Sequence, residues 1–169
     1  MRALLFGMGG IGQRHLRNLK ELHPEIEVGA YRVKNRVFQI CADLSADYET
    51  DVCKKYGVRS FHTIEDALGF APDLAIVANP TSCHVEIATH LVEAGIPVLL
   101  EKPISNRWVD AERLAELANK KHVPVAVGYM MRYHFCAIRL KKLLEEGAVG
   151  QLHSAALTVH SYVPDWHPY

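Results

Sequence analysis

The sequence predicts an α/β fold built on a doubly wound parallel sheet, and three observations predict it. Short apolar runs alternate with longer helical patterns along most of the 169 residues, as expected when helices join parallel strands. A glycine-rich segment follows the first apolar run, where such folds turn from strand into helix. Hydrophobic residues make up 49% of the chain and charged residues 22%, which is typical of a globular chain of about one domain.

The strands of this sheet are expected to be continuous apolar runs, because a doubly wound sheet is buried on both faces. Turn residues or helical patterns bound each run. The predicted strands are Arg2–Phe6, Ile26–Tyr31, Arg59–His62, Leu74–Ala78, Pro97–Leu100 and Pro124–Val127.

The helices are expected between these strands, where apolar residues recur at helical spacing. Thr63 with Asp66 is a near match to a capping box and marks the start of a short helix. The segment Val33–Thr50 is expected to be either helix or loop. The predicted helices are Gly10–Leu22, Thr63–Leu68, Cys83–Glu93, Arg107–Lys121 and Phe135–Glu146.

The last segment, Gln151–Val163, alternates apolar and polar residues and predicts a strand outside the parallel sheet. A strand left as the final element would expose an unpaired edge, which proteins avoid by pairing or covering it. We therefore expect one domain over residues 1–150 and the start of a truncated α+β domain over 151–169. The chain is then either a fragment or must find a partner strand, as it would in a homo-oligomer.

The glycine-rich segment fits G-x-G-x-x-G and points to a dinucleotide site in a Rossmann fold. Its residues are Gly7, Met8, Gly9, Gly10, Ile11 and Gly12. Gly7 would permit the tight turn, Gly9 would let a pyrophosphate approach the backbone, and Gly12 would let helix and strand pack closely. The helix N-terminus would add N–H donors and the positive end of a dipole. The alternative, a plain strand-to-helix turn, needs one glycine and not three at fixed offsets.

The residue types after the second strand favour NADP(H) over NAD(H). In this fingerprint an acidic residue about 20 positions on accepts the ribose 2′-hydroxyl. Here Arg32 stands at that position, followed by Lys34 and Arg36, with no carboxylate between Val28 and Phe38. A guanidinium pairs well with a 2′-phosphate. The missing carboxylate also argues against a methyltransferase that uses the glycine loop for S-adenosylmethionine.

Polar clusters follow the other predicted strands at the same edge of the sheet. They are Asn79-Pro80-Thr81-Ser82 with His84, Glu101-Lys102-Pro103, and Gly128-Tyr129 with Arg132. Taken singly, each is an ordinary loop or strand end. Because open α/β sheets bind ligands at the carboxyl ends of their strands, their common position predicts a crevice with an adjoining substrate site.

The glycine segment continued through Gln13-Arg14-His15, together with these three clusters in order, resembles the Gfo/Idh/MocA oxidoreductases. The resemblance implies a nicotinamide cofactor and hydride transfer at a hydroxyl carbon of a sugar, nucleotide sugar or cyclitol. Lys102 would lie beside the reacting hydroxyl, where an ammonium can bind the developing alkoxide and relay a proton. The Lys102–Pro103 bond is a candidate for the cis form. Cofactor contacts are expected from Gly7, Gly9, Gly10, Ile11, Gly12, Arg32, Lys34, Arg36, Asn79, Pro80, Thr81, His84, Glu101, Lys102 and Arg132.

Members of that family continue into a second, open-faced sheet domain that completes the substrate site. The resemblance therefore implies that this chain by itself binds NADP(H) or NAD(H) but turns over substrate poorly or not at all. The alternative is a non-catalytic dinucleotide-binding module or sensor that oligomerises through its C-terminal strand.

Composition excludes several other classes. Equal numbers of basic and acidic residues, 19 of each, leave no field to attract nucleic acid or a membrane surface. No apolar run approaches the roughly 18 residues of a membrane span. The four cysteines form no C-x-x-C pair, which argues against a disulfide framework or a zinc site and favours a cytoplasmic protein. No metal is expected.

Overall fold

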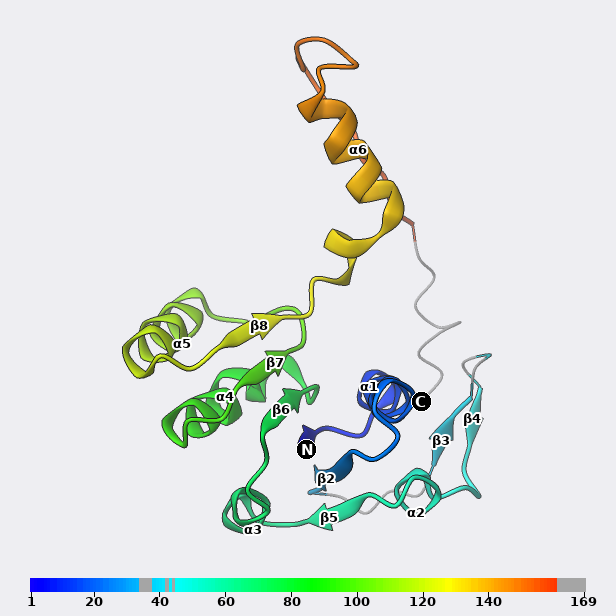
Figure 1. The fold of residues 1–169 in the computed structure, drawn as a ribbon, viewed down its shortest axis with the longest axis vertical. Helices are drawn as coiled ribbons and strands as arrows, with labels where there is room; N and C mark the ends of the chain where they lie inside the picture. Colours follow the sequence, from blue (N-terminus) through cyan, green and yellow to red (C-terminus); the bar gives the residue numbers. More distant parts are fainter. Residues whose placement is uncertain (34–37, 42, 44, 161–169) are drawn as a thin grey trace. The chain divides into compact units, whose positions relative to one another are not determined.

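The computed structural model describes residues 1–33, 38–41, 43 and 45–160 (Figure 1). The chain forms two compact units, Met1–Gly128 and Tyr129–Tyr169, which are described separately below. Among the described residues, no helix is both long and apolar enough to cross a membrane.

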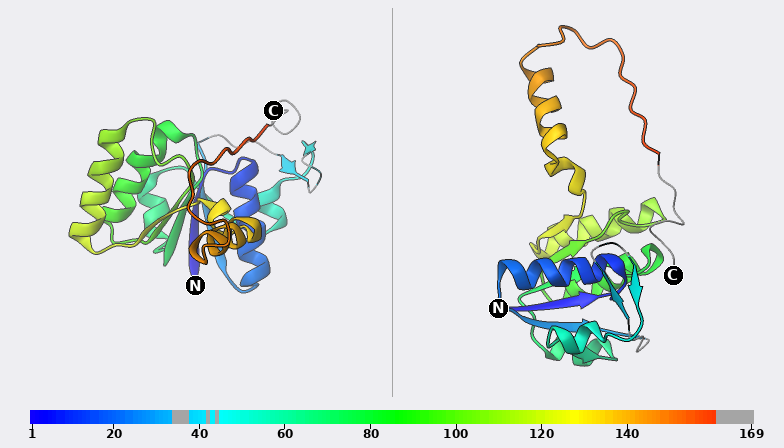
Figure 2. Two further views of the ribbon diagram at one scale, coloured as in Figure 1. Left: turned by 90° about the horizontal axis from the view of Figure 1, so that it is seen from above. Right: turned by 90° about the vertical axis from the view of Figure 1, so that its right-hand side faces the viewer.

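The first unit is built on a six-stranded sheet in which every neighbouring pair of strands is parallel. The strand order is β5-β2-β1-β6-β7-β8, the Rossmann arrangement, so the predicted fold class is confirmed for this unit (Figures 1 and 2). The strands are β1 Arg2–Phe6, β2 Glu27–Tyr31, β5 Arg59–Phe61, β6 Leu74–Val77, β7 Val98–Leu100 and β8 Val125–Val127. All six predicted strands are present, each within one residue of its predicted ends.

Helices cover both faces of this sheet. Successive side chains of a strand point to opposite faces, so one strand can contribute to the core on each side. Leu4 and Phe6 of β1 pack with residues of α3 (Ile64–Gly69), α4 (His84–Glu93) and α5 (Trp108–Lys121). Ala3 and Leu5 belong to a second core cluster with residues of α1 (Gly10–Leu22) and α2 (Val52–Lys55). Strands buried on both sides explain why the sequence shows continuous apolar runs.

The Val33–Thr50 prediction was wrong where the structure describes this segment. Neither a helix nor a plain loop is found there: β3 (Gln39–Ile40) pairs with β4 (Ala46–Asp47) as a small antiparallel sheet. The short helix α2 that follows was not predicted either. Strands this short carry no readable periodicity, so pattern analysis had nothing to detect.

A buried side chain of α1 fixes this small sheet in place. Gln13 is fully buried, its Nε2 donates to the carbonyl oxygens of Met8 and Phe38, and its Oε1 accepts the Ile40 N–H at 2.7 Å. Arg17 also donates to the Ile40 carbonyl. The position of β3 is therefore set by contacts with α1, a helix that is distant from β3 in the sequence.

The second unit contains a 3₁₀ turn, η2 (Met130–Tyr133), and α6 (Phe135–Glu145), which ends one residue before its predicted end. The predicted strand Gln151–Val163 is wrong over its described part: residues 151–160 form no strand, and their side chains are exposed. A strand is stable when another strand satisfies its N–H and C=O groups, and no strand pairs with this segment in the described part of the chain. Residues 161–163 lie outside the described residues.

The N-terminal cap of α3 provides a test of local stability. Thr63 Oγ1 accepts the Asp66 N–H at 3.1 Å, as the capping pattern predicted. Thr63→Ala removes this acceptor and should lower the free energy of unfolding by about 1 kcal/mol in urea titrations. Thr63→Ser keeps a hydroxyl and should lose much less. Equal stability of the Ala variant and the wild type would contradict the cap.

Candidate functional site

The glycine loop lies at the topological switch point of the sheet. β1 and β6 are neighbours, but the chain leaves β1 toward β2 and leaves β6 toward β7. Gly7 follows β1 with φ +97°, a conformation that favours glycine, and a Cβ there would lie 2.6 Å from the Ala78 carbonyl oxygen. Such switch points are where open α/β sheets form a ligand crevice.

The other two glycines of the motif have different surroundings. A Cβ on Gly12 would collide with the Gly7 carbonyl, so glycine is needed there for α1 to pack against the loop. A Cβ on Gly9 would meet no atom within 4 Å, so the backbone faces open space. Gly10 and Ile11 form the first turn of α1, which has neither a side-chain cap nor an acidic residue. An anion would therefore complement this helix N-terminus.

The loop after β6 comes next along the same edge. Asn79 Oδ1 is a buried acceptor without a hydrogen-bond partner in the described part of the chain. Pro80 precedes a 3₁₀ turn, η1, that begins at Thr81. Buried acceptors are rarely left unpaired, so Asn79 is a candidate for contact with a bound molecule.

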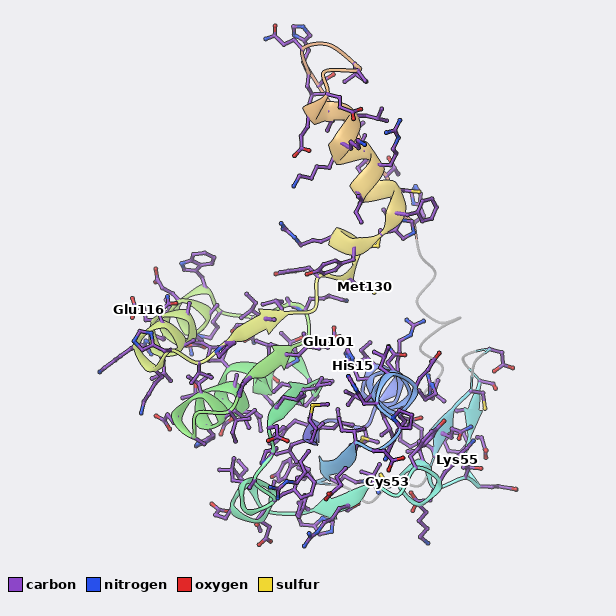
Figure 3. The ribbon with its side chains drawn as sticks, viewed as in Figure 1. His15, Cys53, Lys55, Glu101, Glu116 and Met130 are labelled. Carbon is purple, nitrogen blue, oxygen red and sulfur yellow. The ribbon has the colours of Figure 1, made fainter. Side chains whose placement is uncertain are left out.

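The loop after β7 carries a buried carboxylate beside an exposed lysine. Glu101 is 9% exposed, and its Oε1 lies 2.8 Å from Nε2 of His15 on α1; Figure 3 shows these two side chains next to each other. Glu101 Oε2 accepts the Lys102 N–H at 3.2 Å. A Cβ on Gly128 would lie 3.1 Å from Oε1, so glycine makes room for the carboxylate. The Lys102–Pro103 bond is cis, as expected.

His84 connects the loops after β6 and β7. It is 1% exposed, with Nδ1 2.9 Å from the Pro103 carbonyl oxygen and Nε2 2.8 Å from the Asn79 carbonyl oxygen. Both ring nitrogens thus face backbone carbonyl oxygens, each of which accepts a hydrogen bond only from a protonated nitrogen. This geometry suits a residue that holds the loops of the site in position.

Arg32 follows β2 and is also buried, with 8% of its surface exposed. Its Nη1 lies 4.0 Å from Oδ1 of Asp51, which caps α2 by accepting the N–H groups of Cys53 and Lys54. Burial raises the pKa of the neighbouring Cys53 thiol, and the positive charge of Arg32 opposes this rise by a smaller amount. A carboxylate thus lies beside the predicted phosphate-binding arginine.

The structure brings most of the predicted site residues to the carboxyl edge of one sheet. Lys34 and Arg36 lie outside the described residues, and Arg132 belongs to the second unit. Pattern analysis assigned no role to His15 and did not identify Asp51. Neither residue can be recognised from the sequence around it, because the fold brings its interaction partner from elsewhere in the chain.

Two hollows of about 310 Å³ lie elsewhere on the described surface. One contains Lys20 and Arg59 near the amino ends of β2 and β5, and the other is lined mainly by apolar residues of α5 and β8. Within the described ranges no group of three His, Cys, Asp or Glu residues could hold a metal ion. The candidate site is therefore the open edge formed by the loops after β1, β2, β6 and β7.

Relatives with known names share this fold and sequence pattern. The chain is 30% identical to the inositol 2-dehydrogenase of Corynebacterium glutamicum over 90% of this chain and 43% of that protein. It is 26% identical to the myo-inositol 2-dehydrogenase of Thermotoga maritima over 97% of this chain and 46% of that protein. The chain therefore spans less than half the length of these relatives.

Solved structures agree on the fold. The myo-inositol 2-dehydrogenase of Lactobacillus plantarum superimposes with a TM-score of 0.75 at 22% identity, over 89% of this chain and 42% of that one. The WlbA dehydrogenase of Bordetella pertussis, solved with NADH and UDP-GlcNAcA, gives 0.73 at 22% identity, over 89% and 41%. The model of the oxidoreductase family with an NAD-binding Rossmann fold matches residues 1–129. Because that match covers most of the chain, the chain belongs to the Gfo/Idh/MocA oxidoreductase family.

Proposed function

We propose that this chain is the cofactor-binding part of an NAD(P)-dependent oxidoreductase. The reaction is hydride transfer between the nicotinamide and a hydroxyl carbon of a sugar, nucleotide sugar or cyclitol. The observation that carries the proposal is the glycine loop at the switch point, with the exposed Lys102 at the same edge of the sheet. The names of the inositol dehydrogenases and the UDP-GlcNAcA bound to WlbA support this substrate class.

The residues at this edge fit a dinucleotide. The first turn of α1 would hold the pyrophosphate, because its N-terminus has no side-chain cap and Gly9 leaves the approach open. Asn79, whose Oδ1 has no hydrogen-bond partner among the described residues, and the Pro80–Thr81 turn would line the next part of the crevice. The bound nicotinamide supplies the hydride acceptor or donor; the protein binds and orients it.

Lys102 is the proposed catalytic residue. In the oxidation direction its neutral amine would accept the hydroxyl proton as the hydride passes from the carbon to the nicotinamide, and in the reduction direction its ammonium would donate that proton to the alkoxide that forms. Glu101, buried directly before it, would contribute by fixing the loop. In the domain division we propose, residues 1–150 bind the cofactor and 151–169 begin a substrate domain, so this chain alone turns over substrate poorly or not at all.

The NADP(H) preference is part of the proposal and depends on Arg32. Its guanidinium would pair with the 2′-phosphate, but Asp51 lies 4.0 Å away and competes for the same charge. Asp51 also adds a carboxylate near the end of β2, the feature that accepts a ribose 2′-hydroxyl in NAD sites. The balance between the two side chains would set the cofactor preference.

The glycine loop can be tested without disturbing the fold. Gly9→Val places a side chain in open space and should leave the thermal unfolding midpoint close to that of the wild type while weakening NADPH and NADH binding at least tenfold. Gly69→Val, where a Cβ also meets nothing within 4 Å, is the matched control and should bind normally. Unchanged binding by the Gly9 variant would exclude this loop as the pyrophosphate site.

The cofactor preference is tested by calorimetric titration of the chain with NADPH and, in parallel, with NADH. Arg32→Glu should weaken NADPH by roughly 10- to 100-fold and NADH much less, because one charge-assisted interaction is worth about 1.5–3 kcal/mol. Asp51→Asn should shift the preference toward NADPH. Equal losses for both cofactors in Arg32→Glu would overturn the role of Arg32.

Lys102→Met tests chemistry against simple binding. Cofactor affinity should change by less than about tenfold, because the substitution removes at most the one contact expected from Lys102 and leaves the pyrophosphate site intact. Because this chain alone is expected to turn over substrate poorly, the reaction is measured after joining it to the second domain of an inositol dehydrogenase relative. Formation of NAD(P)H from myo-inositol, followed at 340 nm, should then fall by about 10²-fold or more. A non-catalytic sensor would bind cofactor equally well in both forms and show no reaction to lose.

A further inference from the structure

We propose that His15 and His84 are positioning residues that hold Lys102 between them. The inference deepens the proposed function and rests on it for the chemical role of Lys102. It starts from a simple juxtaposition: the residue before Lys102 contacts one histidine, and the residue after it contacts the other.

The first contact is on the Glu101 side. Glu101 is 9% exposed, and its Oε1 lies 2.8 Å from His15 Nε2. An ionised carboxylate only accepts hydrogen bonds, so His15 Nε2–H is the donor. The other oxygen of the same carboxylate accepts the Lys102 N–H at 3.2 Å. The carboxylate thus links α1 directly to the backbone of Lys102.

The second contact is on the Pro103 side. His84 Nδ1 lies 2.9 Å from the Pro103 carbonyl oxygen, and the ring is 1% exposed. Its Nε2 lies 2.8 Å from the Asn79 carbonyl oxygen in the loop after β6. Because a carbonyl oxygen only accepts, a neutral ring holds Pro103 when Nδ1 carries the proton, and it bonds both carbonyls only when both nitrogens are protonated.

The two histidines come from opposite sides of the sheet. His15 is on α1, whose Leu16 belongs to one core cluster, and His84 begins α4, whose Ile87 belongs to the other. The loop after β7 is therefore fixed from both faces. These contacts restrain the backbone at Lys102. Lys102 itself is exposed, so its side chain can reach a substrate.

Matched substitutions can separate this role from a general effect on folding. The Gln amide reaches about as far as Nε2 of histidine, and the Asn amide about as far as Nδ1. His15→Gln therefore keeps the donor to Glu101, whereas His15→Asn is too short. His84→Asn places an amide donor at the Nδ1 position, next to the Pro103 carbonyl, whereas His84→Gln places its donor at the Nε2 position, next to the Asn79 carbonyl.

The readout is amide hydrogen exchange and ¹⁵N relaxation of the Lys102 N–H in the free chain, with Leu100 on β7 as the internal reference. His15→Asn and His84→Gln should each speed Lys102 exchange about tenfold relative to Leu100. His15→Gln and His84→Asn should stay within about threefold of the wild type. If both variants of a pair lower the thermal unfolding midpoint equally, the difference in Lys102 exchange between them still reports on positioning.

The proposal is overturned if the two members of each pair behave alike, or if the Lys102 amide of the wild type already exchanges as fast as the exposed segment 151–160. Titrations of the same samples with NADPH and NADH test the proposed function separately. Failure of the wild type to bind either cofactor, with the Lys102 contrast intact, would overturn the proposed function and leave the positioning role standing.

Discussion

The structure depends on a close approach of backbone segments at the centre of the sheet. β1 turns into α1 so tightly that Gly7 touches the backbone after β6 and Gly12 touches the carbonyl of Gly7. No side chain fits at either position, and the turn at Gly7 requires a positive φ. This contact brings the N-terminus of α1 to the switch point of the sheet, and every feature of the candidate site is arranged around it.

The carboxyl edge of the sheet combines rigid support with exposed reactive groups. Gln13, His15 and His84 are buried or half-buried and engage backbone carbonyls or a carboxylate. Lys102, and Ile11 in the first turn of α1, are exposed. Sites built in this way hold their reacting groups in place through surrounding contacts, which reduces the reorganisation needed on binding. The His84 ring lies between the loops after β6 and β7, within hydrogen-bond distance of a backbone carbonyl in each.

The cofactor preference illustrates how two side chains distant in sequence can set one property. Arg32 is read from the sequence as a phosphate ligand, yet it is buried beside Asp51. A buried cation needs a compensating charge, so the carboxylate stabilises the arginine. The same carboxylate would also compete with a 2′-phosphate. Arg32 and Asp51 are therefore the residues to substitute when binding of the two cofactors is compared.

The sequence by itself determined the elements whose signal is local. Apolar runs placed all six strands of the parallel sheet, glycine spacing placed the turn into α1, and Thr63 marked the start of α3. Only the tertiary structure decided the small β3–β4 sheet and the pairings of His15 with Glu101 and Arg32 with Asp51. It also showed that alternation over residues 151–160 does not make a strand. These four features share one physical reason. Each depends on whether a partner from a distant part of the chain is present, whereas hydrophobic periodicity reports only which face of a single helix or strand is buried.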